Sequence, residues 1–176
     1  MTSDTAPVHF LLRVASLTRV EGYSALIIDT IDAHSKVLEA KGCVSIGKFG
    51  ASGPTHRVDK LKKQIQDGAR TYLILVTQGR HTKEKKYLGF KAEISSITLG
   101  APTDEIRNAA PSYYRQLGYA ARLWFMVQSP LTICELTRVR LASSKKPVLD
   151  VLTKSRTPSM LVEIATSRAG TPAQQS

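Results

Sequence analysis

The chain has 176 residues, of which 42% are hydrophobic, which is the size and apolar content of one domain with a single core. It carries 25 Lys and Arg against 14 Asp and Glu, a formal net charge of +11. Such basicity favours a nucleic-acid partner, although a basic protein without a polyanionic partner has the same composition. Cys43 and Cys134 are too few for a disulfide framework and lack the CxxC spacing of structural zinc sites.

The apolar pattern argues against membrane insertion and secretion. No apolar run approaches the ~20 residues of a membrane helix, and the first residues lack the basic region and apolar core of a signal peptide. We therefore expect a cytoplasmic protein without a membrane partner, and no residue cluster predicts a metal site, a cofactor or a catalytic centre. Residues 1–7 are expected to form a disordered tail, followed by a first strand over 8–15 and an extended segment over 24–28.

The next segment, residues 31–41, predicts an amphipathic helix that begins after Asp29 or Thr30 as the N-cap and ends at Gly42. His34 lies on or beside the inward face of this helix. A packing histidine with a local hydrogen bond is favoured over a catalytic histidine, because no partner residue lies at the spacing of a catalytic motif.

A predicted strand over residues 43–50 ends in two glycines, Gly47 and Gly50, which flank Lys48 and Phe49. Glycine lets the backbone turn or lets another molecule approach closely, and the pair between the glycines offers a cation and a stacking surface. A ligand-facing edge and a plain turn with Phe49 in the core fit this pattern equally well. The segment is not a P-loop, because the upstream glycine and the following Ser or Thr are missing.

A second, cationic helix is predicted over residues 58–67, ending at Gly68. Its lysines form either a solvated face or, with Arg57 and Arg70, a phosphate-contacting surface.

The chain is organised around a long β-hairpin, Thr71–Ile97. Its first arm, 71–77, is an uncharged run typical of a strand buried on both faces. Its second arm, 87–94, alternates between a packed and a wet face, with Leu88 on the packed face. The intervening loop, 78–86, is too polar to bury and carries four basic residues against one acid.

Aromatic residues concentrate after the hairpin. Five of the chain's eleven aromatic residues lie within residues 113–125, interleaved with Arg115 and Arg122. This composition is typical of a surface that stacks bases and contacts phosphates, although the same residues can cap the end of a barrel. Alternation along a predicted strand, 121–128, places Trp124 and Arg122 on one face, where we expect them to line a pocket.

The remaining segments are short. Residues 98–110 predict a connecting loop with a helical turn, residues 131–141 a strand, residues 147–152 a helix with Pro at its first turn, and residues 160–165 a last strand. From residue 166 to residue 176 the composition is that of a disordered tail.

These elements predict the α+β class, with about six or seven short strands in a small mixed β-sheet curled into a pseudo-barrel and two or three short helices across its openings. Their order, together with Gly47–Gly50, Tyr113–Arg115 and Arg122–Phe125, resembles the PUA-like superfamily, especially its EVE and YTH-type members. The resemblance covers Val8–Ala165 as a single domain.

This resemblance implies a reader of DNA or RNA that holds a flipped or unpaired, often modified, base between aromatic side chains, while basic residues contact the backbone. Trp124 is the first candidate for the stacking wall. It is the single tryptophan of the chain, so tyrosines would have to replace the second and third tryptophans of the cage in YTH-type readers. The expected base-binding residues are Ser45, Lys48, Phe49, Tyr113, Tyr114, Arg122 and Trp124. The expected phosphate-binding residues are Arg57, Lys60, Lys63, Arg80, Lys83, Lys85, Lys86 and Arg115.

Two other functions stay open. Some PUA-like relatives of the ASCH type are linked to nuclease or amidohydrolase chemistry, and a small nuclease or hydrolase that used Lys48, Glu93 and a tyrosine would show no motif. A non-catalytic accessory subunit of a defence or RNA-processing complex, acting with an effector protein, fits the size of the chain equally well.

Overall fold

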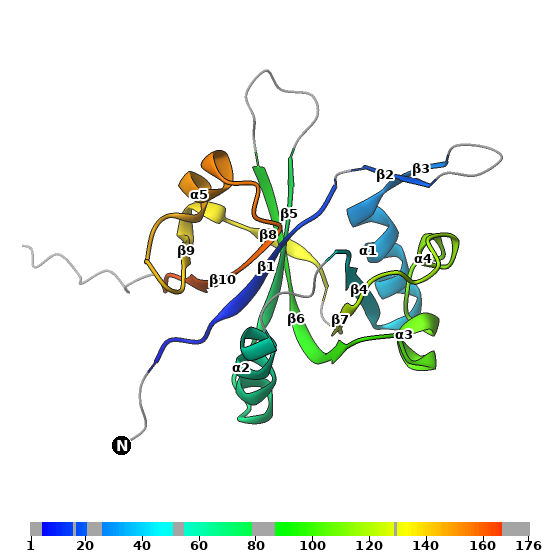
Figure 1. Cartoon of the computed structure of the whole chain (residues 1–176), viewed down its shortest axis with the longest axis horizontal. Helices are drawn as coiled ribbons and strands as arrows, with labels where there is room; N and C mark the ends of the chain where they lie inside the picture. The colour runs from blue at the N-terminus through cyan, green and yellow to red at the C-terminus, as the bar shows by residue number, and fades with distance from the viewer. Residues whose placement is uncertain are drawn as a thin grey trace, which may run out of the picture.

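The computed structural model describes residues 5–15, 17–20, 26–50, 55–78, 87–128 and 130–166, which form ten strands and five α-helices (Figure 1). The strands are β1 (His9–Arg13), β2 (Leu17–Val20), β3 (Leu26–Asp29), β4 (Val44–Lys48), β5 (Tyr72–Gln78), β6 (Tyr87–Leu99), β7 (Leu123–Val127), β8 (Thr132–Cys134), β9 (Val139–Leu141) and β10 (Ser159–Ile164). The helices are α1 (Thr30–Lys41), α2 (Thr55–Gln66), α3 (Asp104–Asn108), α4 (Tyr113–Gln116) and α5 (Val148–Lys154), with a 3₁₀ turn, η1 (Leu136–Arg138).

Eight of the strands form one mixed sheet, which confirms the predicted α+β class. The sheet order is β4-β7-β6-β5-β1-β10-β9, with β8 paired to β6 beside this path, while β2 and β3 form a separate antiparallel pair. All neighbouring strands are antiparallel except β1 and β5. Within the described residues β4 and β9, at the two ends of the path, are not paired with each other, so the sheet is open.

Strand β6 joins the two halves of the sheet. Its residues 87–93 pair with β5 and confirm the predicted hairpin, while its residues 94–99 pair with β7 after a register shift between Ile94 and Ser96. Leu88 was predicted on the packed face but is 44% exposed, and it lies opposite Thr77, one residue pair from the end of the β5–β6 ladder. The tip of the hairpin lies outside the described residues, and with it lie Arg80, Lys83, Lys85 and Lys86.

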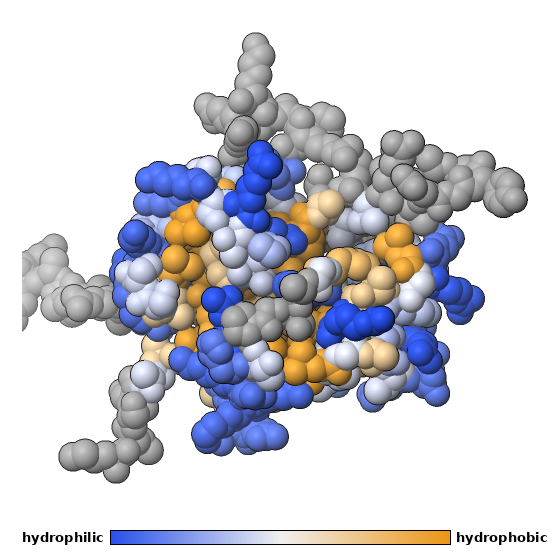
Figure 2. Space-filling model, in the orientation of Figure 1, coloured by the Kyte–Doolittle hydropathy of each residue, from blue (hydrophilic) through white to orange (hydrophobic). Residues whose placement is uncertain are grey.

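Helices cover the sheet in separate groups. Figure 1 shows α1, α3 and α4 beside β4 and β7, α5 beside β9 and β10, and α2 near the lower end of β6. The side chains of Phe10 in β1 and Phe125 in β7 are in contact in the core, where their ring centroids are 4.8 Å apart. Figure 2 shows hydrophobic residues in the middle of the molecule and hydrophilic ones around its edge. None of the helices in the described ranges is long and apolar enough to cross a membrane.

The boundaries of α1 confirm the capping prediction. Asp29 is the N-cap, and its Oδ1 accepts a hydrogen bond of 2.9 Å from the backbone N–H of Asp32. Gly42 ends the helix at a φ of 74°, a left-handed conformation that glycine adopts without steric cost, and its N–H bonds the carbonyl of Leu38. The cap fixes the first turn of α1, on which His34 depends for its hydrogen bond.

Of two predictions about the connecting segments, one was wrong and one was confirmed in part. Residues 131–141 form β8, η1 and β9 instead of one strand, because Leu136 turns inward over Gly89, where an added Cβ would lie 2.7 Å from Leu136 Cδ2. Residues 98–110 contain the predicted helical turn as α3, which Thr103 caps, but β6 runs to Leu99, so the connecting loop is shorter than predicted. The additional helices raise the helix number above the predicted two or three, because pieces of four or five residues show no periodicity.

Strand β4 packs against β7 without room for a side chain at Gly47. A Cβ added there would lie 2.7 Å from Cβ of Ala121 and 2.9 Å from Cζ3 of Trp124. Because real Cβ atoms do not approach other atoms so closely, this contact requires glycine. The sequence had left open what approaches this glycine, and the structure identifies Trp124 as the group that does so.

We expect Gly47→Ala to lower the free energy of unfolding by about 1–3 kcal/mol, because Trp124 or β4 must shift to admit the methyl group. Chemical denaturation followed by circular dichroism measures this change. Ser96→Thr adds a methyl group at an exposed position of β6 and is the matched control, with an expected change within about 0.5 kcal/mol. Equal stabilities of the two variants would show that the Gly47 contact is not tight.

Candidate functional site

A cavity of about 460 Å³ lies where the carboxyl ends of β1 and β4 meet the first turn of α1 and the short helix α4. It lies within the size range of small-ligand sites. Its polar and aromatic lining includes Thr30, His34, Lys48, Phe49, Tyr113 and Tyr114. The structure therefore brings together four of the predicted base-binding residues, Lys48, Phe49, Tyr113 and Tyr114, from segments far apart in the sequence. We call this space the aromatic cavity.

Three aromatic rings are stacked along one side of the aromatic cavity. The ring of Tyr114 is stacked on Phe49 at a centroid distance of 5.6 Å and an interplanar angle of 10°, and on Tyr113 at 4.4 Å and 23°. Tyr113 and Tyr114 are buried, whereas Phe49 is 42% exposed. Phe49 thus ends the stack as its accessible ring, which excludes the alternative that it is tucked into the core.

Buried hydrogen bonds hold Tyr114 in place. The backbone N–H of Gly47 donates to the hydroxyl oxygen of Tyr114 over 3.1 Å, and that hydroxyl is 3.1 Å from Nε2 of His34. Nδ1 of His34 is 2.7 Å from the carbonyl oxygen of Thr30. Because a carbonyl only accepts, we assign the proton of the neutral ring to Nδ1, so Tyr114 donates to Nε2. A continuous chain of hydrogen bonds therefore runs from β4 through Tyr114 and His34 to the first turn of α1.

Burial keeps the members of this chain neutral. Desolvation lowers the pKa of His34 from 6.5 to about 4, although the hydrogen bond to Thr30 opposes this shift. Burial also raises the pKa of Tyr114 and of Tyr113 above the usual value for tyrosine. The cavity wall is therefore uncharged at these positions near pH 7, and His34 is a packing histidine with a local hydrogen bond, as the sequence predicted.

Two cations, Arg13 and Lys48, line the aromatic cavity, and the guanidinium group of Arg13 donates to the carbonyl oxygens of Leu152 and Ser155. Alternation along β4 places Lys48 on the same face as Val44 and Ile46, which are buried in the main core, so its side chain points inward at the end of the strand. Lys48 is buried, and desolvation lowers the pKa of its ammonium group. The site thus combines a lysine in a poorly hydrated position with a stack of aromatic rings.

Three other predicted base-binding residues lie elsewhere. Trp124 is 1% exposed behind Tyr114, at a ring distance of 5.1 Å, and its Nε1–H donates to the carbonyl of Ala121. Ser45 is fully buried and donates to the carbonyl of Ile106. Arg122 is exposed and donates to the carbonyls of Tyr119 and Ala121. The predicted shared face of Trp124 and Arg122 does not form a pocket, because α4 covers the tryptophan.

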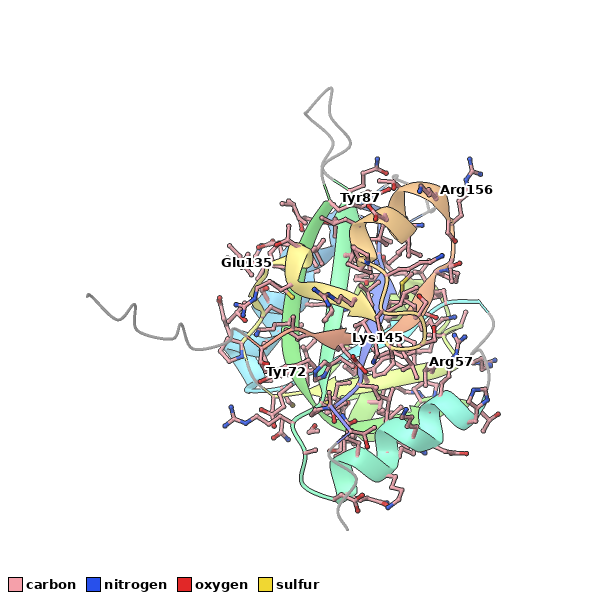
Figure 3. All side chains as sticks on the ribbon, turned by 90° about the vertical axis from the view of Figure 1, so that its left-hand side faces the viewer. Arg57, Tyr72, Tyr87, Glu135, Lys145 and Arg156 are labelled. Carbon is pink, nitrogen blue, oxygen red and sulfur yellow. The ribbon has the colours of Figure 1, made fainter. Side chains whose placement is uncertain are left out.

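The basic residues predicted to contact phosphate are distributed over several surfaces. Arg57 and Lys60 on α2 line a second cavity, whereas Lys63 forms an exposed ion pair with Asp67 at 3.0 Å. Arg115 is exposed on α4. Figure 3 looks onto the face that carries Arg57 and shows Lys145 and Arg156 on it as well, from the turn after β9 and the segment after α5.

The structure does not bring Glu93 together with Lys48 and the tyrosines in the aromatic cavity, as the hydrolase alternative requires. Glu93 lies in the half of β6 that pairs with β5 and is not among the described residues that line the aromatic cavity. The described residues contain no group of three or more His, Cys, Asp or Glu side chains that could hold a metal ion. Sequence reasoning placed His34 correctly in the core but did not predict that it lines a cavity. The spacing of Thr30 and His34, four residues apart, was the signal for its hydrogen bond.

Comparisons with known proteins leave the chain without an assigned family. No protein-family model, no curated protein and no solved structure matches it. The resemblance to the PUA-like superfamily therefore stays a prediction.

The buried neutral histidines make stability depend on pH. The folded-state pKa of His34 and of His9 is lowered to about 4, so between pH 6.5 and 4 the unfolded chain binds protons that the folded chain does not. The free energy of unfolding should therefore fall as pH falls through this window, by up to about 1.4 kcal/mol per pH unit for each histidine.

Urea unfolding at intervals between pH 7 and pH 5 measures this slope. His34→Gln retains a hydrogen-bonding group but has no titratable ring, so it should remove the contribution of His34 to the slope of the free energy of unfolding against pH. Gln66→Asn, at an exposed position of α2, changes no titratable group and should leave the slope unchanged. A wild-type slope in His34→Gln would contradict the assignment of a neutral, buried His34.

Proposed function

We propose that this protein binds nucleic acid by accommodating one unpaired or flipped base in the aromatic cavity, while basic residues on the adjoining surface contact the phosphate backbone. The observation that carries this proposal is the stack of Phe49, Tyr114 and Tyr113 beside the buried Lys48. Proteins that bind single-stranded nucleic acid use aromatic rings to stack bases and cations to contact the backbone.

The position of Phe49 supports stacking more than its exposure does, since single exposed hydrophobic residues are common on protein surfaces. Its ring is parallel to the buried ring of Tyr114 within 10°. A planar ligand on Phe49 continues a stack that is already fixed by the hydrogen bonds of Tyr114. The entropy cost of ordering this surface is therefore largely met in the free protein.

Lys48 supports a base that offers acceptors. An ammonium group has three donors and no acceptor, and both ring nitrogens of the neighbouring His34 already have hydrogen-bond partners. A base with a carbonyl group, which means guanine, cytosine, uracil or thymine, suits this lining better than adenine, which has no carbonyl group. Modified bases that retain such a carbonyl are included in the proposed ligand class.

We also propose that the open sheet is a PUA-like pseudo-barrel. The contact between Phe10 and Phe125 supports this proposal, because it joins β1 and β7, which are three strands apart in the sheet order, across the interior. In such an arrangement the aromatic cavity lies at the mouth of the barrel, where β1 and β4 end.

Titration of fluorescent single-stranded DNA and RNA, with and without modified bases, tests the proposal. Phe49→Ala should raise the Kd of the best oligonucleotide by roughly 5- to 150-fold, which corresponds to the ~1–3 kcal/mol of stacking on one aromatic ring. Ile133→Ala removes a side chain that is 81% exposed on β8 and is the matched control, with an unchanged Kd. Oligo(U), whose base has carbonyl groups, should bind the wild type with a lower Kd than oligo(A). Lys48→Met should reduce the ratio of these two Kd values by roughly tenfold.

The proposal fails if every oligonucleotide binds with the same weak affinity, or if Phe49→Ala and Ile133→Ala have the same Kd as the wild type. Thermal unfolding of each variant shows whether a loss of binding is a loss of folding.

A further inference from the structure

A second cavity, of about 480 Å³, lies between α2, the turn after β9 and the start of β10. Its polar lining consists of His56, Arg57, Lys60, Ser143, Thr157 and Ser159. The floor is apolar and is formed by residues of β9, α5 and β10. Neither the aromatic stack nor the hydrogen-bond chain of Tyr114 extends into it, so its chemistry is separate. We call it the basic cavity.

The charge of the basic cavity has one sign. Arg57 and Lys60 are three residues apart on α2, so their side chains lie on the same face of the helix, and His56 adjoins them. None of the described residues that line the cavity is acidic. A cleft lined by cations with an apolar floor concentrates a positive potential and attracts an anion.

The opposite wall adds hydroxyl groups. Ser143, Thr157 and Ser159 reach the cavity from the turn after β9 and from the segment that enters β10. The hydroxyl of Thr157 is 2.6 Å from the hydroxyl of Ser155, which fixes its orientation. Guanidinium and ammonium groups facing hydroxyl donors make up the residue set that contacts phosphate oxygens in nucleic-acid complexes.

The two cavities share a short strip of chain. Pro158 lines the aromatic cavity, while its neighbours Thr157 and Ser159 line the basic cavity. Since consecutive Cα atoms are ~3.8 Å apart, this strip spans about 7 Å, which is within the reach of one nucleotide. A strand that placed a base in the aromatic cavity would therefore carry a phosphate over Pro158 to Arg57 and Lys60.

We infer that the basic cavity is a phosphate-binding site and that it holds the phosphate that links the base in the aromatic cavity to the next nucleotide. The second half of this inference rests on the proposed function, whereas phosphate binding by the cavity stands on its own residues. Two sources of the phosphate are distinguished by experiment: the diester of a polynucleotide and the free or terminal phosphate of a small molecule.

The experiment follows backbone amide shifts of the full chain by NMR during titration with inorganic phosphate, a nucleoside, its 5′-monophosphate and a dinucleoside monophosphate. Phosphate should shift the amides of α2 and of Thr157–Ser159. Arg57→Gln with Lys60→Gln should abolish these shifts, whereas Lys36→Gln with Lys41→Gln removes the same charge from α1 and should retain them. The dinucleoside monophosphate should bind roughly tenfold or more tightly than the nucleoside, and the double change on α2 should remove this gain.

Each outcome separates the two proposals. If phosphate changes the amide shifts of neither α2 nor Thr157–Ser159, or changes them equally in both double variants, the proposed phosphate site is wrong. Base binding in the aromatic cavity is then judged by the nucleoside titration alone. If phosphate binds but the nucleoside does not shift Phe49 or Tyr114, the proposed base pocket is wrong, and the basic cavity serves a small phosphate-bearing molecule. Equal affinities for nucleoside and dinucleoside monophosphate overturn the link between the cavities.

Discussion

The contact of Trp124 and Ala121 with the backbone of Gly47 is the constraint on which the site depends. Because residue 47 has no side chain, β7 and its tryptophan approach β4 closely, and the backbone N–H of Gly47 stays accessible to the hydroxyl of Tyr114. Tyr114 is thereby fixed between Phe49 and Tyr113, and its hydroxyl reaches His34. A larger residue at this position would separate the strand from the aromatic layer and displace the ring on which Phe49 is stacked.

The aromatic cavity combines a wall of hydrogen-bonded aromatic side chains with a buried lysine. Hydrogen bonds account for each polar atom along the path from Gly47 to Thr30, so this side of the cavity offers a planar, uncharged surface. Lys48 is buried beside this surface, and desolvation lowers the pKa of its ammonium group. A carbonyl group of a ligand beside Lys48 would accept a hydrogen bond from the ammonium group, which is the physical reason for the carbonyl-bearing bases proposed for the aromatic cavity.

The sequence was sufficient for elements with strong local patterns. The hairpin of β5 and β6, the capped helix α1 and the amphipathic helix α2 follow from periodicity, Asp29 and Gly42, and the burial of His34 follows from its place on α1. The position of Trp124 did not follow, because alternation correctly identifies the face of a strand but not what covers that face. Here α4, a helix of four residues without periodicity, buries the tryptophan. The arrangement of Arg57 and Lys60 around one cavity with hydroxyl groups from residues 143–159 likewise depends on contacts distant in sequence.

Strand β6 belongs to both parts of the sheet. It is hydrogen-bonded to β5 along one half and to β7 along the other, and β7 in turn holds β4, from which Lys48 and Phe49 extend. Loss of either ladder would expose an edge of the shared strand, so each part of the sheet stabilises the other through β6. We therefore expect the amide hydrogens of β6 that bond β5 and β7 to be among the slowest of the chain to exchange with solvent, and the aromatic cavity is attached to this part of the sheet through β7 and β4.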